Sequence, residues 1–213
     1  MNKIVLELQK DAVDSNSDVV SLLRKAYLVA RKLKLKEFES WINNELNGYG
    51  HNKVPNYRIF KGRLKGRNIL NSWEEIAVPL KYEKLINNYE MRQPIFTVVN
   101  MCNNKKINST KIGLPLKLNK IFLDFFDDET EFAISISNNQ LYAVIERVKN
   151  IILDWTINLE ENGILGENLE FSSSERECAQ KNPIIYNYIN NFYGDVNNTQ
   201  IQQDTKKSIQ SKK

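Results

Sequence analysis

The feature that most limits how this chain can fold is a stretch of 25 residues, Asn138 to Asn162, in which apolar side chains recur at helical spacing. Gly163 and Gly166 follow this stretch and predict where the helix ends. A helix of about five to six turns with a continuous apolar stripe needs a large partner surface, which we expect from the N-terminal helices and one face of a sheet. The stripe consists of Leu141, Val144, Ile145, Val148, Ile151, Ile152, Trp155 and Leu159.

Three further helices are predicted before Gly48 and Gly50, which end the helical pattern. The first helix ends near Asp14, and Ser17 or Asp18 can cap the second. The apolar faces of the three helices are Ile4, Val5, Leu8 and Ala12; Val19, Leu22, Leu23, Ala26, Tyr27, Ala30 and Leu33; and Phe38, Trp41, Ile42 and Leu46.

The middle of the chain changes to shorter elements and to the alternation typical of strands. We expect extended segments over 57–67 and 73–80, helical segments on both sides of Pro94 within 85–101, a short helix after Pro115, and a strand over 132–136. Helices at both ends with strands between them indicate the α+β class. The expected architecture is a set of N-terminal helices and one long C-terminal amphipathic helix packed on a small, mainly antiparallel sheet.

Composition divides the chain into three parts. Residues 1–171 contain the periodic apolar segments, and we expect them to form one globular domain. Residues 172–193 form a connector with a short helix, for which Ser174 and Glu177 have the spacing of a capping box. Residues 194–213 form a polar tail with few apolar side chains.

Several classes of site are excluded by composition. His51 is the single histidine, and Cys102 and Cys178 are the two cysteines, so no multi-histidine or cysteine-rich metal site can form. The chain has no phosphate-loop or dinucleotide motif, and we expect neither a metal nor a cofactor. No apolar run is long enough to span a membrane, and residues 1–10 do not resemble a secretory signal. We therefore expect a cytoplasmic protein that has no membrane partner.

Charge is distributed very unevenly along the chain. Residues 51–120 contain fourteen basic residues (Lys and Arg) and four acidic residues (Asp and Glu), which gives a net charge of +10. Residues 121–180 contain three basic and thirteen acidic residues, which gives a net charge of −10. In one interpretation, the two segments fold against each other and their fields cancel. In the other, the surface is bipolar and can meet an anion or a second copy of the chain.

Four basic residues occupy alternate positions of the extended segment 57–67. Alternate residues lie about 6.6–6.8 Å apart on one face of a strand, which is close to the spacing of phosphates along a nucleic-acid strand. The pattern predicts a nucleic-acid-binding site formed by Lys61, Arg63, Lys65 and Arg67, with Tyr57 and Ile59 on the same face as a stacking or apolar platform. The alternative is a solvated face or a basic edge strand, with acidic partners at Asp124, Asp127, Asp128, Glu129 and Glu131.

Glu45 and Arg58 are the candidates for catalysis. Glu45 is a potential general base next to Asn43 and Asn44, although general acid–base catalysis needs a carboxylate close to the proton that it moves. The alternative is structural, because asparagine side chains also bind backbone groups at a helix end and Trp41 has the spacing of a core residue.

Several segments of the chain together form a recognisable pattern, whose most specific part is the run Trp41-Ile42-Asn43-Asn44-Glu45-Leu46-Asn47-Gly48-Tyr49 within residues 37–49. The other segments are residues 22–26, 30–33, 54–58 and 160–167. This combination resembles the AbiTii domain family of bacterial abortive-infection and other antiphage systems, and the resemblance covers roughly residues 2–180. It implies a role in phage defence and supplies no catalytic mechanism.

The polar tail is similar to tails found on various bacterial conflict proteins, with Asp204 where such tails often have glycine. Stacked in register between chains, its isoleucines would be buried while Asn and Gln side chains form ladders. This predicts an assembly tag, with plain disorder as the alternative. The candidate oligomerisation residues are Gly194, Asp195, Gln200, Ile201, Gln202 and Ile209.

Two hypotheses of function follow from the sequence. The first is a sensor or adaptor of an antiphage system that acts by assembly, as a homo-oligomer or with other defence proteins, and that contacts nucleic acid. The second is an effector enzyme, such as a nuclease, with a site near Glu45, Arg58 and the basic strand.

Overall fold

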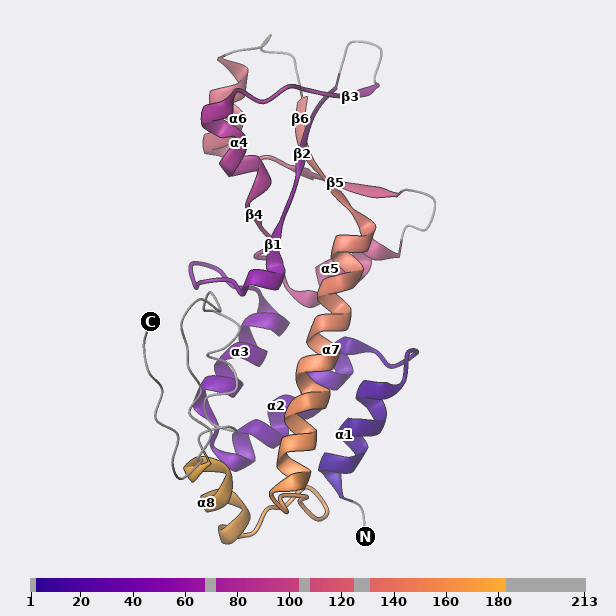
Figure 1. The fold of residues 1–213 in the computed structure, drawn as a ribbon, viewed down its shortest axis with the longest axis vertical. Coiled ribbons are helices and arrows are strands. Elements are labelled where there is room, and N and C mark those ends of the chain that lie inside the picture. Colours follow the sequence, from indigo (N-terminus) through magenta and orange to yellow (C-terminus); the bar gives the residue numbers. More distant parts are fainter. Residues whose placement is uncertain (1–2, 68–71, 104–107, 125–130, 183–213) are drawn as a thin grey trace, which may run out of the picture.

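The computed structural model describes residues 3–67, 72–103, 108–124 and 131–182. Within these ranges a group of helices forms one end of the molecule and a small sheet with two helices forms the other (Figure 1). The long helix α7 (Asn138–Glu161) starts at the sheet and runs into the helical end. The two ends are therefore joined by an element that belongs to both.

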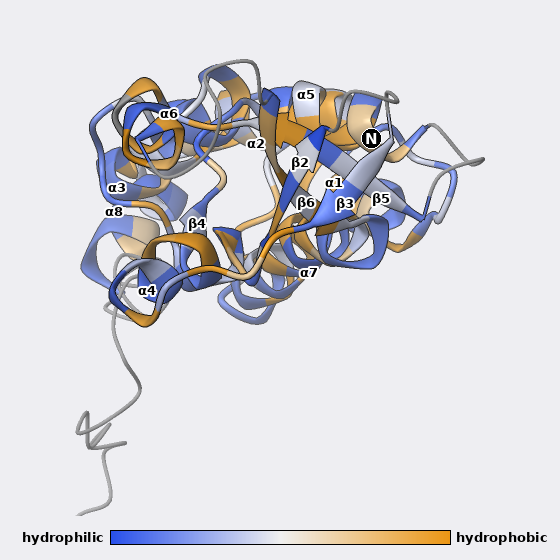
Figure 2. Ribbon diagram, turned by 90° about the horizontal axis from the view of Figure 1, so that it is seen from above, coloured by the Kyte–Doolittle hydropathy of each residue, from blue (hydrophilic) through white to orange (hydrophobic). Residues whose placement is uncertain are grey.

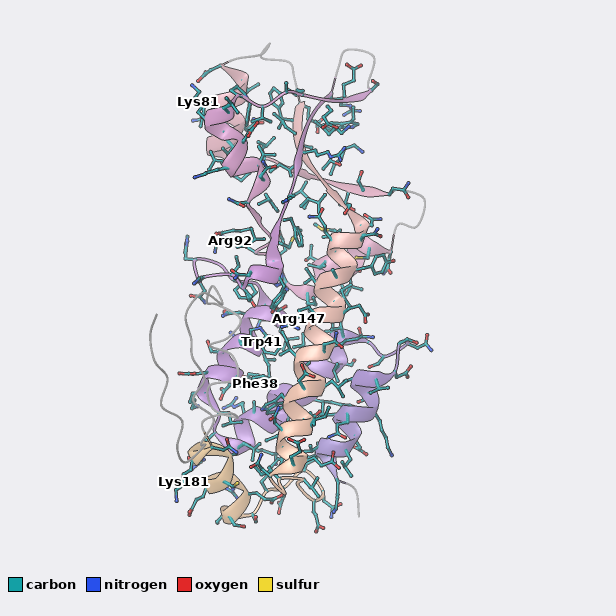
Figure 3. All side chains as sticks on the ribbon, in the orientation of Figure 1. Phe38, Trp41, Lys81, Arg92, Arg147 and Lys181 are labelled. Carbon is teal, nitrogen blue, oxygen red and sulfur yellow. The ribbon has the colours of Figure 1, made fainter. Side chains whose placement is uncertain are left out.

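The helical end forms around α7. Its other members are α1 (Ile4–Val13), α2 (Val19–Leu33), α3 (Lys36–Asn47), α5 (Ile95–Cys102) and α8 (Ser173–Lys181). Phe38 stacks on Trp155 with ring centroids 4.1 Å apart, and Figure 3 shows Phe38 and Trp41 inside this end. The predicted stripe of α7 is buried here, because α1, α2 and α5 pack against it.

The sheet has four antiparallel strands in the order β3-β2-β6-β5. They are β2 (Arg63–Arg67), β3 (Trp73–Glu75), β5 (Ser109–Gly113) and β6 (Glu131–Ser137). A separate pair, β1 (Ile59–Phe60) with β4 (Tyr89–Glu90), links the sheet to the helices. Seen from the sheet end, β2 carries much blue, because three of its five residues are Arg or Lys (Figure 2).

Two short helices, α4 (Leu80–Asn87) and α6 (Leu116–Leu123), cover the apolar face of the sheet. Phe122 of α6 contacts Phe132 of β6, with ring centroids 6.0 Å apart. Leu64 and Ile134, paired across β2 and β6, are also buried on this face. The opposite face therefore carries the side chains that alternate with these residues.

The predicted α+β class is confirmed, and so are the three opening helices. At the start of α2, the side chain of Asp18 accepts hydrogen bonds from the backbone N–H groups of Val20 and Ser21, as one of the two predicted caps.

The partners of the long helix differ from the prediction. We expected α7 to pack partly on the sheet, but α4 and α6 cover the apolar face of the sheet. The reason is that β6 passes directly into α7 at Ser137, so that the helix continues away from the strands.

Several predicted boundaries also move. The segment 57–67 is broken by a 3-10 turn, η1 (Asn56–Arg58), and by the interval 61–62 between β1 and β2. The predicted strand 73–80 ends at Glu75, because α4 begins directly after Pro79. The capping box of α8 is formed by Ser172 and Glu175, two residues before the pair with the expected spacing.

A pair of glycines at the sheet tests how tightly β2 packs against α4. A Cβ atom on Gly62 would overlap Ile134 Cγ2 and lie 3.0 Å from the carbonyl oxygen of Ile86, whereas a Cβ atom on Gly113 would meet nothing within 4 Å. We expect Gly62→Ala to lower the free energy of unfolding by about 1–3 kcal/mol through overpacking, and the control Gly113→Ala to leave it unchanged or slightly raised. Urea denaturation measures both values, and equal stability of the two variants would contradict this packing.

Candidate functional site

Glu45 and Arg58 form an ion pair inside the protein, with both side chains 0% exposed. Glu45 lies on α3, and Arg58 is the last residue of η1. Oε1 of Glu45 accepts hydrogen bonds from the hydroxyls of Tyr49 and Tyr57, each at 2.6 Å, and from Nε of Arg58 at 2.9 Å. Its other oxygen accepts a bond from Nη2 of Arg58. The carboxylate is thus fully engaged by groups of the same chain.

The rest of the Arg58 guanidinium is also engaged. Nη1 donates to the carbonyl oxygens of Met91 at 3.0 Å and Gln93 at 2.8 Å. Burial acts to lower the pKa of Arg58, but the adjacent Glu45 carboxylate outweighs this effect and raises it. Burial and the same carboxylate raise the pKa of Tyr57 well above its usual value. At neutral pH the Arg58 guanidinium is therefore charged and the Tyr57 phenol is neutral.

This network explains the most specific part of the family resemblance. Trp41, Glu45 and Tyr49 are spaced by four residues, so they lie along one side of α3 and of the turn that follows it. Nε1 of Trp41 donates to the hydroxyl of Tyr57 at 2.9 Å. We predicted that Tyr57 shares the face of the basic residues, which is wrong because η1 turns it toward Glu45 instead.

The geometry gives Glu45 and Arg58 a structural role, because they tie α3 to η1 and to the segment 91–93. A general base must reach a proton on its substrate, and the oxygens of Glu45 are instead bound by Arg58 and two tyrosines in a site with no exposure. The assignment of these residues to catalysis stays a prediction.

The basic residues lie at the other end of the molecule, on β2. Arg63, Lys65 and Arg67 share one face of this strand, and their side chains are 73%, 25% and 41% exposed. Lys61 is exposed and precedes the strand. Because β3 and β6 flank β2, the basic residues are on a central strand rather than on an edge.

Two carboxylates partly neutralise this face. Glu75 lies 3.5 Å from Arg63 and 3.8 Å from Lys65, and Glu131 lies 2.8 Å from Arg67. These pairs are exposed, so each contributes about 0–1 kcal/mol at most to stability. Glu131 was among the predicted acidic partners and Glu75 was not, whereas Asp127, Asp128 and Glu129 lie outside the described residues.

Sequence reasoning missed two further members of this face. Trp73 of β3 is paired with Arg67, and Lys111 of β5 is paired with Ser135 of β6. Residues paired across antiparallel strands share a face, so both side chains lie on the same side as Arg63. The Nζ atom of Lys111 lies 5.6 Å from the centre of the Trp73 ring. We name the group Arg63, Lys65, Arg67, Trp73 and Lys111 the cationic face.

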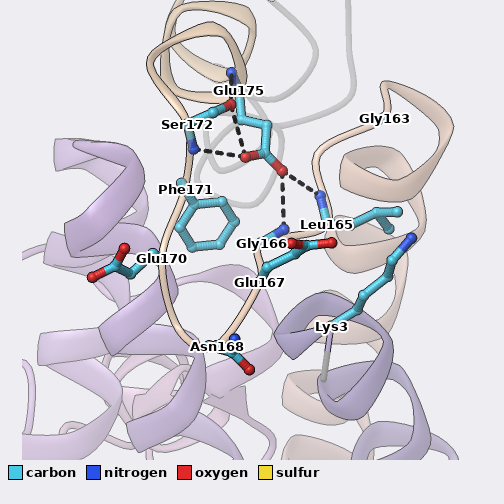
Figure 4. A pocket seen from close by; sticks show the side chains of 10 residues that line it. All are labelled: Lys3, Gly163, Leu165, Gly166, Glu167, Asn168, Glu170, Phe171, Ser172 and Glu175. Atoms are coloured by element: carbon cyan, nitrogen blue, oxygen red, sulfur yellow. Dashed lines mark hydrogen bonds between the residues drawn. The ribbon is translucent and has the colours of Figure 1, made fainter. Parts of the chain in front are cut away.

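A pocket of about 600 Å³ lies at the far end of the helices, between α8 and the turn after α7 (Figure 4). In it, the carboxylate of Glu175 accepts bonds from the backbone N–H groups of Leu165 and Gly166, each at 3.0 Å, and of Ser172 at 2.7 Å. Burial acts to raise the pKa of Glu175, but these hydrogen bonds outweigh it and lower the pKa. Glu175 therefore closes a backbone turn and caps α8.

The described part of the chain gives no support for several other classes of site. In the described ranges, no three His, Cys, Asp or Glu side chains are grouped so that they could hold a metal ion. Burial raises the pKa of the Cys102 thiol to about 11, which makes it a poor nucleophile. No described helix is both long and apolar enough to cross a membrane. The candidate oligomerisation residues between Gly194 and Ile209 lie outside the described residues.

The structural role of the buried pair is testable. Glu45→Gln would leave the Arg58 charge buried and without its counter-ion, so we expect the free energy of unfolding to fall by about 3–5 kcal/mol. A matched control is Glu90→Gln, which removes the partner of Arg92 from a pair that is 44% and 39% exposed and is expected to cost less than about 1 kcal/mol. Urea denaturation compares them, and equal losses would show that the buried pair does not stabilise the fold.

Comparison with known proteins adds one finding to this geometry. A comparison with curated proteins found no match, and neither did a comparison with solved structures. A model of the AbiTii family matches residues 3–184, which include the buried network and the whole of the cationic face. The chain therefore belongs to the AbiTii family.

Proposed function

We propose that this protein is a non-enzymatic component of abortive-infection defence, a sensor or adaptor that contacts nucleic acid through its cationic face and assembles through its tail. The family name links the chain to abortive infection. The observation that carries the proposed nucleic-acid contact is the contrast between the two groups of charged side chains. Glu45 and Arg58 are paired with each other in the interior, whereas Arg63 and Arg67 remain accessible on one side of the sheet.

Nucleic-acid contact is supported by the arrangement of the face. Two carboxylates, Glu75 and Glu131, are shared by three of its four cations, and the fourth, Lys111, lies near the Trp73 ring instead. The four cations also project from strands, which hold the spacing between positive charges fixed. Phosphate contacts of this kind position a nucleic acid without reading its sequence.

Assembly through residues 194–213 rests on the sequence alone. Ile201 and Ile209 are apolar positions in a segment that has one further apolar side chain, Val196, and is rich in Asn, Gln and Thr. Such a segment gains little by folding alone but can bury both isoleucines when copies stack in register. The partner is a second copy of this chain or another defence protein with a similar tail.

The alternative function is an effector enzyme such as a nuclease. It requires a site near Glu45, Arg58 and β2, with Glu45 released from Arg58 and the two tyrosines. A Glu45→Ala protein that stays folded and loses its protective or toxic activity would favour this alternative. Retained activity would remove Glu45 as a catalytic residue.

Truncation tests the assembly. Because α8 packs against α2 and Ala179 is 0% exposed, a chain that ends after Asn182 keeps the described elements intact. We expect the full-length chain to form a larger assembly than residues 1–182 in light scattering. The same number of subunits in both would contradict assembly through the tail.

Two point variants of the full-length chain sharpen this test. Ile201→Asp with Ile209→Asp places charge at the apolar positions, and we expect it to dissociate the assembly. Gln203→Asp with Ser211→Asp adds the same charge at neighbouring polar positions and is the matched control. Dissociation by both pairs would indicate charge repulsion rather than burial of the isoleucines.

Salt dependence tests nucleic-acid contact. Replacing Arg63 and Lys65 by Ser should weaken binding of a single-stranded oligonucleotide and lower the slope of log K against log salt by about 1.4, or about 0.7 for each lost phosphate contact. Fluorescence anisotropy measures both. The control replaces Lys36 and Lys181 by Ser, which are also exposed and paired with carboxylates, and Figure 3 shows Lys181 at the end opposite the sheet. No binding by the unmodified protein at low salt would refute the proposal.

A further inference from the structure

We propose that Trp73 and Lys111 form a nucleotide-binding platform that selects single-stranded nucleic acid, with the indole stacking on a base and Lys111 and Arg67 binding the adjoining phosphates. This inference rests on the proposed nucleic-acid contact and names its substrate class. No motif marks either residue, and they are brought together only by the sheet.

The platform spans the whole width of the sheet. Trp73 lies on the edge strand β3 and Lys111 on the opposite edge strand β5, with β2 and β6 between them. The Lys111 ammonium nevertheless reaches to 5.6 Å from the centre of the indole ring. Part of the surface between the two strands is made of small residues, because Ala133 and Gly113 are paired with each other in β6 and β5, while Lys65 of β2 is paired with Ala133 on the other side.

Burial of the small residues supports the same arrangement. Ala133 and Ser135 alternate with Phe132, Ile134 and Ile136, so they face away from α4 and α6. They are nonetheless only 4% and 9% exposed. Part of this cover comes from Lys65, which is paired with Ala133 and is 25% exposed, and from the half-buried Trp73, whereas Arg63, Arg67 and Lys111 stay exposed.

The chemistry of the pair fits a nucleotide better than a simple anion. The contact between an exposed ammonium and an indole is weak, and each group has a stronger partner in nucleic acid. A base offers a flat ring for the indole, and a phosphate offers a full charge for the ammonium. Arg67, paired directly with Trp73, places a second cation beside the ring.

Base stacking on Trp73 requires an unpaired base. In a duplex the bases are stacked on one another and hidden from a flat protein surface, so that only phosphates would meet the cationic face. In a single strand the bases can be splayed out and stacked on an aromatic side chain. A face built only for phosphates would not need an indole.

Tryptophan fluorescence gives a direct readout of the platform. The chain has three tryptophans, and Trp41 and Trp155 are 1% and 0% exposed, so a ligand at the cationic face changes the emission of Trp73. We expect a single-stranded oligothymidylate to quench the emission of the full-length protein. A duplex of equal length should bind with little quenching.

Variants of Trp73 separate stacking from charge. Trp73→Val retains a strand-forming residue without a ring and should bind oligothymidylate about 5- to 150-fold more weakly, with duplex binding unchanged. Trp73→Phe retains a ring and should lose less affinity. Lys111→Gln should lower the salt slope by about 0.7.

Each outcome distinguishes this inference from the proposed function. No anisotropy change with any oligonucleotide refutes both. Binding that depends on Arg63 and Lys65 but is equal in the wild type and Trp73→Val refutes only the platform, as does equal affinity for duplex and single strand. Quenching of Trp73 by polyglutamate as strongly as by the oligonucleotide would show that the face binds an acidic protein segment instead.

Discussion

The buried ion pair between Glu45 and Arg58 is the constraint on which the arrangement of the two ends depends. Two opposite charges in an interior are tolerated only if their remaining donors and acceptors are also satisfied. Here two tyrosine hydroxyls and the carbonyl oxygens of Met91 and Gln93 satisfy them. The pair therefore fixes α3, η1 and the segment after β4 relative to one another, because moving any of them would uncover a buried charge.

The position of the cationic face follows from this constraint. The backbone N–H of Met91 donates to the carbonyl oxygen of Arg58 at 2.8 Å. The two residues that follow Arg58 form β1, which pairs with β4. β2 begins only a few residues later, at Arg63. At the other side of the sheet β6 runs into α7 at Ser137, whose side chain caps the helix. The sheet is thus held to the helices at two points, and the cationic face points outward from a fixed support.

The parts of this structure that could be predicted from the sequence are those formed by residues close together in the chain. Helical periodicity is local, which is why the stripe of α7 and the opening helices could be predicted. Glu45 and Arg58 could also be selected from the sequence as candidate residues. Their burial could not be predicted, because charged side chains are almost never fully buried unless they are paired. Of their partners, Tyr49 keeps the four-residue spacing of Trp41 and Glu45, whereas Tyr57 lies in the 3-10 turn η1, whose geometry leaves no periodic signal. Trp73 and Lys111 are 38 positions apart and share a face only through strand order and register.

The uneven distribution of charge along the chain acquires a physical meaning from this arrangement. The acidic segment 121–180 supplies the whole of α7, which lies against α1 and α2. There Gln9 donates to Glu160, and Lys149 donates to the carbonyl oxygens of Asp14 and Ser15. The basic segment 51–120 instead supplies β2, β3 and β5. The carboxylate that binds Arg63 and Lys65 is Glu75, which belongs to the same basic segment. An ion pair that joins the two segments is Arg67 with Glu131. The two segments nevertheless pack against each other, since β6 lies between β2 and β5 and α5 packs on α7. Because Arg63, Arg67 and Lys111 remain exposed in this arrangement, they keep the positive field on which the proposed contact with an anionic partner rests.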